Sequence, residues 1–451
     1  MRKYDLVVIG TGPAASTVAT KVARLDKSVA VIESSGFGGT CALRGCNPKK
    51  VYTNAGDLLD RSRRTNGKLA TFDGARIDWA SLWAFKQEFT QPILEKTEGS
   101  LRRKGIDTYV GVARFESDNK IDVDGKILEA ERIFVGTGAS PATLDIQGEE
   151  FVTLSDEFFE QKTIPPHVMF IGGGYISMEF AHVVARYGSK VVIVNHHARP
   201  LQQFDPTLVD QLVKWSESLG IQFINNARVV SIEKTGRGSL NVQWTDSTGC
   251  QAIETDLVIH GAGRLPNLEK LQLDRGNVRF GKNGIEVDNY MRSVSNPRVF
   301  AAGDCADSPM PRLTPVANEQ ARIIVKNLFV DTLVERPDYG FVPKVVFTSP
   351  CLAAVGVLEE EAINSGLDID VRYEETSDWS SVRKTGQGCA AYKVIVDKSD
   401  GRILGAHLLG PAAEETINIF ALAMKFDLTA TNIKSTLFAF PTFASDVRKM
   451  L

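Results

Sequence analysis

One pattern occurs twice in this chain, and it restricts the possible fold more than any other feature. Residues 4–9 (YDLVVI) form an apolar, β-branched run that leads into GTGPAAS and then into a helical stretch. Residues 168–171 (VMFI) lead into GGGYIS in the same way. A strand, a glycine turn and a helix in this order are the fingerprint of a dinucleotide-binding fold. The repeat therefore predicts two such folds in one chain.

In the first copy, Gly10, Gly12 and Ala15 occupy the fingerprint positions. Gly10 permits the tight turn, Gly12 lets a pyrophosphate approach the backbone, and Ala15 keeps the helix close to the strand. A second apolar run, SVAVIE, ends at Glu33, whose carboxylate can accept a hydrogen bond from a ribose hydroxyl. A carboxylate at this position favours a nucleotide whose ribose carries no phosphate.

In the second copy, Gly172, Gly174 and Ser177 keep the same spacing. Position 195 follows position 172 by 23 residues, as 33 follows 10, but it carries Asn195 instead of an acid. An acid would repel a 2′-phosphate, whereas an amide followed by basic side chains favours one. The basic side chains here are His196, His197 and Arg199. We therefore expect NADPH rather than NADH, with ordinary polar loop residues as the alternative explanation.

A third signal indicates that the first nucleotide is FAD. The run VFAAGDCAD places Gly303 and Asp304 directly after a strand, where flavoproteins of this architecture hold the ribitol chain. The second nucleotide fold would then be inserted into the first, between the strand-to-glycine connections VGTGASP and HGAGRLPN. The candidate cofactor contacts at these connections are Thr137, Gly138, Gly263 and Arg264, the last of them a contact for the second nucleotide.

The segment GFGGTCALRGCNPKK adds two cysteines to a glycine loop. Gly39 and Thr40 suit a phosphate-cradling loop at the start of a helix. In an ideal helix, the Cα atoms of residues five apart, such as Cys41 and Cys46, lie about 8–9 Å apart. A disulfide needs less than about 7 Å, so the pair predicts a helix distorted at Gly45 and a strained, reducible disulfide. The alternative is a chance spacing of two buried cysteines.

Composition excludes several other classes of protein. The chain has 451 residues, enough for two to four domains, and its 43% apolar and 24% charged residues are ordinary for a globular protein. A net charge of −3 gives no reason to expect a nucleic-acid partner. No apolar stretch approaches the roughly 20 residues that cross a bilayer, so no membrane is expected. Six scattered cysteines indicate a reducing, cytoplasmic location, and we expect no bound metal.

The whole chain resembles the flavoprotein disulfide reductases, the family of glutathione reductase, dihydrolipoamide dehydrogenase and mercuric reductase. The segments that carry this resemblance are GTGPAAS, GGTCALRGCNPKK, the first GTG turn, GGGYISMEFA, HGAGRLPN, AAGD, LTPVANEQAR and GAHLLGPAAEETIN. The resemblance implies that Cys41 is the interchange thiol, which faces the substrate, and that Cys46 is the charge-transfer thiol, which faces the flavin. It also implies that Lys49 lies near flavin N5 and pairs with Glu179.

The same resemblance implies further roles. Tyr175 would gate the nicotinamide pocket, Asp304 would bind FAD, and Thr314 would lie near the flavin. The protein would be a homodimer whose last domain, about 340–451, completes the partner's active site. We therefore expect an α/β fold with two Rossmann-like domains and a C-terminal α+β dimerisation domain. The expected borders are 1–142 and 268–339 for the FAD domain, 143–267 for the NAD(P)H domain and 340–451 for the dimerisation domain.

One part of the family pattern is missing. Members that reduce disulfides end with a His-Pro-Thr segment and a Glu five residues after the His, but this chain has Phe440 and Ser445 there. No histidine occurs after His407, and Asp446 is at most a weak substitute. Glutathione reductases also carry an Arg at the position of Thr20. Both halves of the acid/base dyad are therefore absent.

This absence affects the expected substrate. A positioned acid/base contributes about 10²–10⁴-fold to a rate, so rapid reduction of glutathione disulfide or lipoamide is not expected. We expect electrons to pass from NADPH through FAD to Cys41–Cys46 and on to a disulfide or another small electrophile. Two alternatives stay open: a reductase of quinones, metals or oxygen that uses the cysteines as a relay, and a redox-sensing flavoprotein of low turnover.

Overall fold

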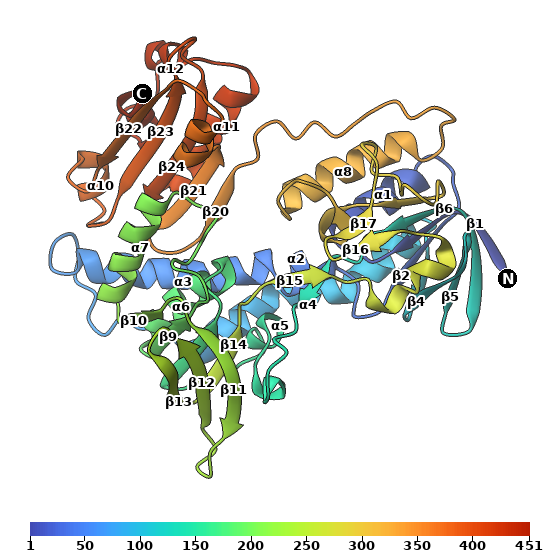
Figure 1. Cartoon of the computed structure of the whole chain (residues 1–451), viewed down its shortest axis with the longest axis horizontal. Helices are drawn as coiled ribbons and strands as arrows, with labels where there is room; N and C mark the ends of the chain where they lie inside the picture. The colour runs from blue at the N-terminus through green and yellow to red at the C-terminus, as the bar shows by residue number, and fades with distance from the viewer. The chain divides into compact units, whose positions relative to one another are not determined.

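The computed structural model describes all 451 residues, which form two compact units (Figure 1). The first unit comprises residues 1–49, 85–142 and 264–339, and the second comprises residues 50–84, 143–263 and 340–451. Two long helices, α3 (Cys46–Thr65) and α4 (Trp79–Arg103), have residues in both units. Residues 50–84 thus group with the second unit and not with the rest of 1–142. The division into four domains remains a prediction.

The first unit is built on a seven-stranded mixed sheet with the strand order β3-β2-β1-β6-β5-β4, in which β18 also pairs with β6. The strands are β1 (Arg2–Ile9), β2 (Val29–Glu33), β3 (Asp107–Val110), β4 (Ala113–Ser117), β5 (Lys120–Val123), β6 (Lys126–Val135) and β18 (Val299–Ala301). Helices α1 (Pro13–Ala23) and α8 (Thr314–Asn327) pack on this sheet in one hydrophobic core. Parallel strands buried on both faces read as continuous apolar runs, as YDLVVI does.

Shorter elements complete the first unit. They are α2 (Gly39–Leu43), the antiparallel pair β7 (Ala139–Pro141) and β15 (Arg264–Pro266), a small sheet of β16 (Phe280–Gly281), β17 (Gly284–Glu286) and β19 (Ala306–Asp307), and the 3₁₀ helices η2 (Glu269–Leu271), η3 (Leu273–Gly276) and η4 (Gly303–Cys305). Of these, α2 and η4 carry candidate site residues.

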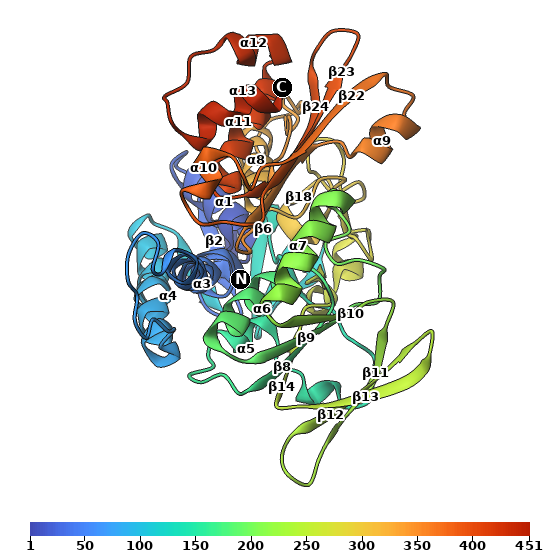
Figure 2. The same ribbon diagram turned by 90° about the vertical axis from the view of Figure 1, so that its left-hand side faces the viewer.

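The second unit repeats the parallel arrangement with the order β10-β9-β8-β14. Its elements are η1 (Glu149–Phe151), α5 (Ser155–Phe158), β8 (His167–Ile171), α6 (Tyr175–Tyr187), β9 (Lys190–Val194), α7 (Pro206–Ser218), β10 (Ile221–Ile224) and β14 (Leu257–His260). A meander of β11 (Arg228–Lys234), β12 (Leu240–Asp246) and β13 (Gly249–Thr255) accompanies the sheet. Figure 2 shows α6 and α7 on one side of the parallel sheet and the meander on the other.

Residue alternation along β8 explains this layering. Val168 and Phe170 belong to the hydrophobic cluster that includes α6, whereas Met169 and Ile171 belong to the cluster that includes the meander. Successive side chains of a strand point to opposite faces, so an uninterrupted apolar run supplies both cores. The apolar sequence VMFI is therefore required by burial on both sides.

The C-terminal part of the second unit is an antiparallel sheet with the order β20-β21-β24-β23-β22 and accompanying helices. Its elements are β20 (Lys344–Val346), β21 (Cys351–Gly356), α9 (Glu359–Asn364), β22 (Ile369–Glu375), α10 (Ser380–Arg383), β23 (Ala391–Asp397), β24 (Ile403–Gly410), α11 (Ala413–Lys425), α12 (Ala430–Ser435) and α13 (Phe443–Met450). The predicted α/β class, with two doubly wound parts and a C-terminal α+β part, is confirmed.

A buried ion pair ties three segments of the second unit together. Asp60 of α3 accepts hydrogen bonds from Arg186 of α6 at 3.2 and 2.8 Å, and Arg186 also donates to the carbonyl of Ser349 at 2.9 Å. The side chains of Arg186 and Asp60 are only 2% and 5% exposed. Loss of Asp60 would remove the carboxylate that the buried Arg186 guanidinium contacts, which typically costs about 3–5 kcal/mol. The pair therefore fixes α3 against α6.

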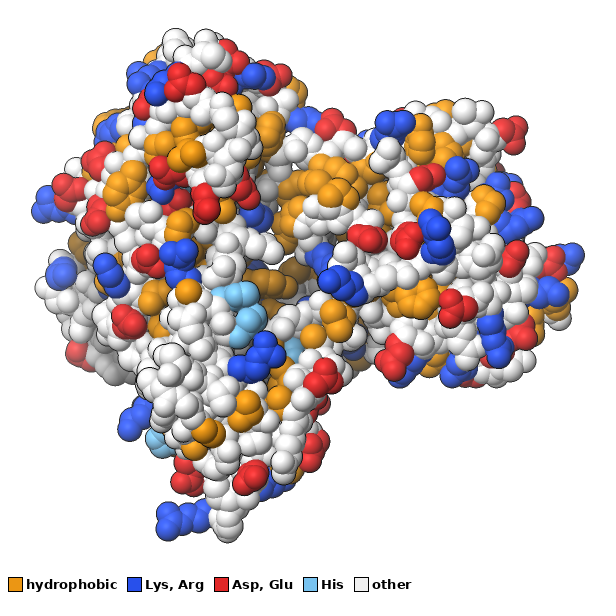
Figure 3. All heavy atoms as spheres, in the orientation of Figure 1, with side chains coloured by type: hydrophobic (Ala, Val, Ile, Leu, Met, Phe, Trp, Pro, Cys, Tyr) orange, Lys and Arg blue, Asp and Glu red, His pale blue; other side chains and the backbone are white.

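On the face drawn in Figure 3, acidic and basic side chains are interspersed, so this face shows no field of a single sign. No helix combines the length and the apolar character that a bilayer crossing requires.

Candidate active site

The two cysteines lie at a break between two helices. Helix α2 ends at Leu43, Arg44 leaves the helical conformation, and α3 begins at Cys46. A Cβ on Gly45 would lie 2.9 Å from the carbonyl oxygen of Thr40. Only glycine fits such an approach without a shift. The predicted distortion at Gly45 is confirmed.

Both cysteines are present as free thiols, the reduced form of the couple. A hydrogen bond with Cys46, together with burial, raises the pKa of the Cys41 thiol, and a hydrogen bond from Thr314 opposes this shift. The Thr314 hydroxyl donates to Cys41 Sγ at 3.4 Å and lies 3.9 Å from Cys46 Sγ. The two cysteines thus form one contact group with Thr314, a residue far from them in sequence, at the start of α8.

The first glycine turn has the shape that its sequence predicts. Gly10 has φ +102°, and a Cβ there would lie 2.4 Å from the carbonyl oxygen of Gly136. A Cβ on Gly39 would lie 2.4 Å from the Cα of Gly12, so the loop before Cys41 packs directly on the fingerprint turn. Nothing lies within 4 Å of the Cβ position of Gly12. The two loops therefore leave open space beside Gly12, where a pyrophosphate would approach the backbone.

Glu33 ends β2 with a buried carboxylate that is 8% exposed. Its Oε2 accepts from the Thr11 hydroxyl at 2.5 Å, and its Oε1 accepts from the backbone N–H groups of Ser34 and Ser35 at 2.9 Å. A carboxylate has about four acceptor positions, so Oε2 still has one for a ribose hydroxyl. Glu33 therefore also holds the loop after β2 in place.

The remaining first-site candidates meet around η4. Burial raises the pKa of the Cys305 thiol, and hydrogen bonds from Thr137 and Gly138 partly offset this shift. Both residues therefore lie next to Cys305. Burial raises the pKa of the neighbouring Asp304 carboxyl, and Arg312 and Arg264 lower it. The structure thus places Arg264 near Asp304 in the first unit, where it also donates to the carbonyl of Ala139 at 2.5 Å. Sequence reasoning had assigned Arg264 to the second nucleotide only.

The second glycine turn repeats the first. A Cβ on Gly172 would lie 2.6 Å from the carbonyl oxygen of Gly261. This matches the first turn, where a Cβ on Gly10 would meet the carbonyl oxygen of Gly136. Tyr175 is the first residue of α6 and is 48% exposed. Nothing lies within 4 Å of the Cβ position of Gly263. These positions are compatible with a nucleotide that approaches the backbone between β8 and β14, the point where the strand order reverses.

Asn195 uses its amide to hold its own loop. Its Nδ2 donates to the carbonyl of His197 at 3.0 Å and to Asn225 Oδ1 at 3.1 Å. The rings of His196 and His197 lie with their centroids 3.8 Å apart and their planes tilted by 41°. Burial lowers the pKa of His196, and the neighbouring His197 and Arg228 lower it further. His196 is therefore harder to protonate than a free imidazole, which leaves Arg199 and Arg228 as the permanent positive charges near this loop.

Glu179 of α6 is 1% exposed, and its carboxylate contacts Lys50 and Phe347 within the second unit. Lys50 Nζ donates to its Oε2 at 2.9 Å, and the backbone N–H of Phe347 donates to its Oε1 at 3.1 Å. Lys50 also lies over the Phe347 ring, 3.4 Å from the centroid. The sequence analysis did not identify Lys50, a lysine of the same motif as Lys49, and the pairing of Lys49 with Glu179 stays a prediction. Lys49 itself is 8% exposed.

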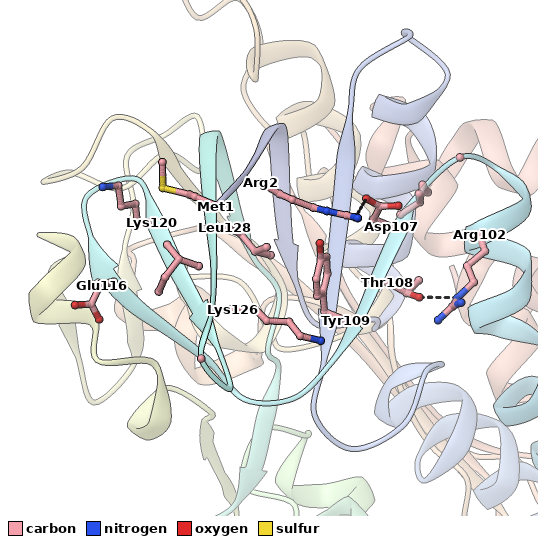
Figure 4. Close-up of a pocket in the computed structure, with 14 residues that line it drawn as sticks. Met1, Arg2, Arg102, Asp107, Thr108, Tyr109, Glu116, Lys120, Lys126 and Leu128 are labelled. Carbon is pink, nitrogen blue, oxygen red and sulfur yellow. Dashed lines mark hydrogen bonds and ion pairs between the residues drawn. The ribbon is translucent and has the colours of Figure 1, made fainter.

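A wide hollow of about 1060 Å³ lies elsewhere in the first unit. It sits at the amino ends of β1, β3 and β6, opposite the carboxyl ends where parallel sheets bind ligands (Figure 4). Arg2 in its wall pairs with Asp107 at 3.1 Å, and Arg102 pairs with Glu98 at 2.7 Å. Because these cations are exposed and already paired, the hollow is not a candidate for the redox site.

Comparison with known proteins identifies the family. Residues 4–321 match the model of the pyridine nucleotide-disulphide oxidoreductases, and residues 342–451 match the dimerisation domain of the same family. The chain belongs to this family. Its members carry out NAD(P)H- and FAD-dependent disulfide oxidoreduction, so this chain is an enzyme of that class with FAD and a nicotinamide cofactor. The dimerisation domain makes it a homodimer.

Individual relatives cover nearly the whole chain. A glutathione reductase from Burkholderia cepacia is 31% identical over 449 residues, 99% of this chain and 98% of its own. A mercuric reductase from Lysinibacillus sphaericus is 30% identical over 449 residues, 99% of this chain and 81% of its own. The Cu(II) complex of the HOCl-induced flavoprotein disulfide reductase RclA from Escherichia coli has a TM-score of 0.89 at 27% identity, covering 100% of this chain and 99% of that chain.

The C-terminal segment of this oxidoreductase carries the residues at which the sequence predicts a departure from the family pattern. Phe440 is 84% exposed on the single chain, and Leu437 is 90% exposed. Ser445 is the third residue of α13 and forms a capping box with Thr442, in which each backbone N–H donates to the other's hydroxyl at 3.1–3.2 Å. Asp446 is buried and pairs with Lys449 at 3.2 Å. Ser445 thus caps a helix.

Proposed function

We propose that this oxidoreductase passes electrons from NADPH through FAD to the Cys41–Cys46 pair and on to a small electrophile. The observation that supports it best is the contact group of the two thiols with Thr314, directly after a glycine loop that packs on the first fingerprint turn. A bound flavin would accept hydride from the nicotinamide and deliver the two electrons to the cysteines. We propose the cytoplasm as its compartment, because a reducing environment keeps the other cysteines as thiols.

In the proposed reaction the two cysteines have different roles. The Cys41 thiolate attacks one sulfur of a disulfide substrate, and the first substrate thiolate leaves and takes up a proton. Cys46 then loses its proton and attacks Cys41 Sγ, and the second substrate thiolate leaves and takes up that proton. The Cys41–Cys46 disulfide is thereby restored. Two electrons leave the protein in each cycle. Lys49, with Glu179, would stabilise negative charge beside the pair, and Tyr175 would cover the nicotinamide.

We propose NADPH as the reductant because Asn195 replaces an acid and the loop carries Arg199. Arg228 is the first residue of β11 and lies close enough to His196 to lower the pKa of that histidine. It is a second arginine near this loop, which the sequence analysis did not identify.

We expect Arg199→Gln to lower the efficiency of flavin reduction by NADPH about tenfold, the scale of one lost charged hydrogen bond. The efficiency of flavin reduction by NADH should not change. Stopped-flow reduction measures both, with the remote Arg237→Gln as control. Equal efficiency of the wild type with NADH would refute the assignment.

The active site is proposed to be shared across the homodimer, with Phe440 of the partner subunit close to Cys41. The support is that this ring is left almost fully uncovered by its own chain. Leu437, three residues earlier, is also 90% exposed. Exposed apolar residues that lie together mark interaction surfaces, and a partner subunit's substrate cleft would bury this pair.

A second candidate reaction is the reduction of metal ions, with Cu(II) as the substrate. Two observations favour it: a relative whose structure is described as a Cu(II) complex has a TM-score of 0.89, and the C-terminal acid/base dyad is absent. Two Cu(II) ions would take one electron each from the dithiol, which forms the disulfide and releases two protons. No leaving group needs a proton, so the missing dyad would cost little.

One experiment separates these reactions from a low-turnover sensor. Anaerobic titration with NADPH should consume two equivalents, one for the disulfide and one for the flavin. Steady-state NADPH oxidation is then measured with glutathione disulfide, lipoamide, a quinone and Cu(II). Turnover with a disulfide supports the first proposal, and turnover with Cu(II) alone supports the second. Turnover with none of the panel would contradict both and favour the sensor.

A further inference from the structure

One hydroxyl group contacts both sulfur atoms of the redox pair. Thr314 Oγ1 donates to Cys41 Sγ at 3.4 Å and lies within hydrogen-bonding distance, 3.9 Å, of Cys46 Sγ. The cysteines precede it in the chain by 273 and 268 residues. Thr314 is the first residue of α8 and is followed by Pro315, so its backbone is held by a helix start. The position of this hydroxyl is therefore set by the fold.

A threonine hydroxyl has one hydrogen to donate and two lone pairs that accept. It can thus accept from the S–H of one cysteine while it donates to the sulfur of the other. A β-branched side chain has few χ1 rotamers, which helps to keep both contacts.

The reduced cysteine pair of this chain needs a group that can take the proton from the Cys41 thiol. The thiolate is the nucleophile in disulfide exchange, yet burial and the hydrogen bond with Cys46 keep the proton on Cys41. Relatives use a histidine to remove that proton, and this chain carries Phe440 in its place. The groups that shift the pKa of Cys41 are Cys46 and Thr314 themselves. The proton must therefore move within the pair or to water.

We propose that the Thr314 hydroxyl relays one proton between Cys41 and Cys46. In the forward direction the Cys41 thiol gives its proton to Thr314 Oγ1, while Oγ1 gives its own proton to the Cys46 thiolate. One S–H bond and one O–H bond break, one of each forms, and no electron moves. The product is a Cys41 thiolate that accepts a hydrogen bond from Thr314, which is the direction that the structure shows. This relay rests on the proposed function, and it makes Thr314 a catalytic residue, because it touches both reacting sulfurs.

The test measures thiolate reactivity directly. The FAD-loaded protein is reduced anaerobically with dithiothreitol, which is removed before limiting iodoacetamide is added at pH 7. Peptide mass spectrometry follows the alkylation of Cys41, with the exposed Cys250 as an internal standard. We expect Thr314→Val, which removes the hydroxyl at nearly constant shape, to slow Cys41 alkylation about tenfold or more. Thr314→Ser, which keeps the hydroxyl, should stay within about threefold of the wild type.

Two results would overturn the relay. The first is wild-type alkylation of Cys41 in Thr314→Val, and the second is an equal loss in Thr314→Ser, which would point to packing by the methyl group. If Thr314→Val does not retain FAD and native melting, Thr314→Ala removes the same hydroxyl and is judged by the same limits. Failure of the proposed function is recognised separately: NADPH would then expose no additional thiols in the wild type, whereas the dithiothreitol experiment would be unaffected.

Discussion

Replacing Cys46 by Ser is expected to abolish the long-wavelength charge-transfer absorbance that NADPH titration produces in the wild type. It should also lower turnover with disulfide substrates on the order of 10³-fold or more, the scale of losing one member of a covalent catalytic unit. The absorbance requires a thiolate beside the flavin, and a serine hydroxyl is not ionised at neutral pH. Anaerobic spectral titration and steady-state kinetics measure the two effects.

The control variants make this prediction specific to each cysteine. Cys41→Ser should lose turnover equally but keep the band, because Cys46 is then a thiolate that cannot form the disulfide. Cys250→Ser, on the exposed start of β13, should change neither. If Cys46→Ser keeps the band and Cys41→Ser loses it, the two roles are exchanged, and if both keep it the band has another origin.

The fold was largely predictable because its signals are local. Each fingerprint turn is constrained by contacts that only glycine permits, as at Gly10 and Gly172, where a Cβ would meet the carbonyl oxygen of the opposite connection. The same holds for the helix break at Gly45. Such positions can be recognised in the sequence because a steric requirement leaves one residue type.

Contacts between distant segments were not predictable in this way. Nothing in LTPVANEQAR shows that Thr314 reaches both cysteines, because that contact depends on how α8 packs beside the glycine loops. The grouping of residues 50–84 with the second unit depends on aromatic packing, in which Tyr52 and Trp79 meet Phe158.

The second large effect is expected from restoring the missing dyad. Phe440→His together with Ser445→Glu should raise disulfide-reducing activity tenfold or more, within the about 10²–10⁴-fold range of a positioned acid/base. The imidazole would take the proton from the Cys41 thiol and return it to the leaving thiolate. Both changes are needed, because an unoriented imidazole in an apolar site favours its neutral form and other rotamers.

The structure indicates that the double variant will fold. Phe440 is 84% exposed on its own chain, so its removal opens no cavity within the subunit. Ser445 is the third residue of α13 in a capping box with Thr442. Glu is a preferred residue at that position, since its carboxylate can reach back to the N-cap backbone N–H. The helix start should therefore keep its cap.

A matched control carries the same two residue types in the wrong geometry. Leu437→His with Ser445→Glu places an imidazole at another highly exposed position three residues earlier, and it should not raise disulfide turnover. Reduction of Cu(II) should not rise in either double variant, because that reaction needs no protonated leaving group. If the wild type reduced disulfides as fast as typical relatives do, the missing acid/base dyad would not limit this reaction, and the prediction would be refuted. A dimer structure with Phe440 far from the partner's cysteines would refute it as well, because a histidine there could not exchange a proton with Cys41.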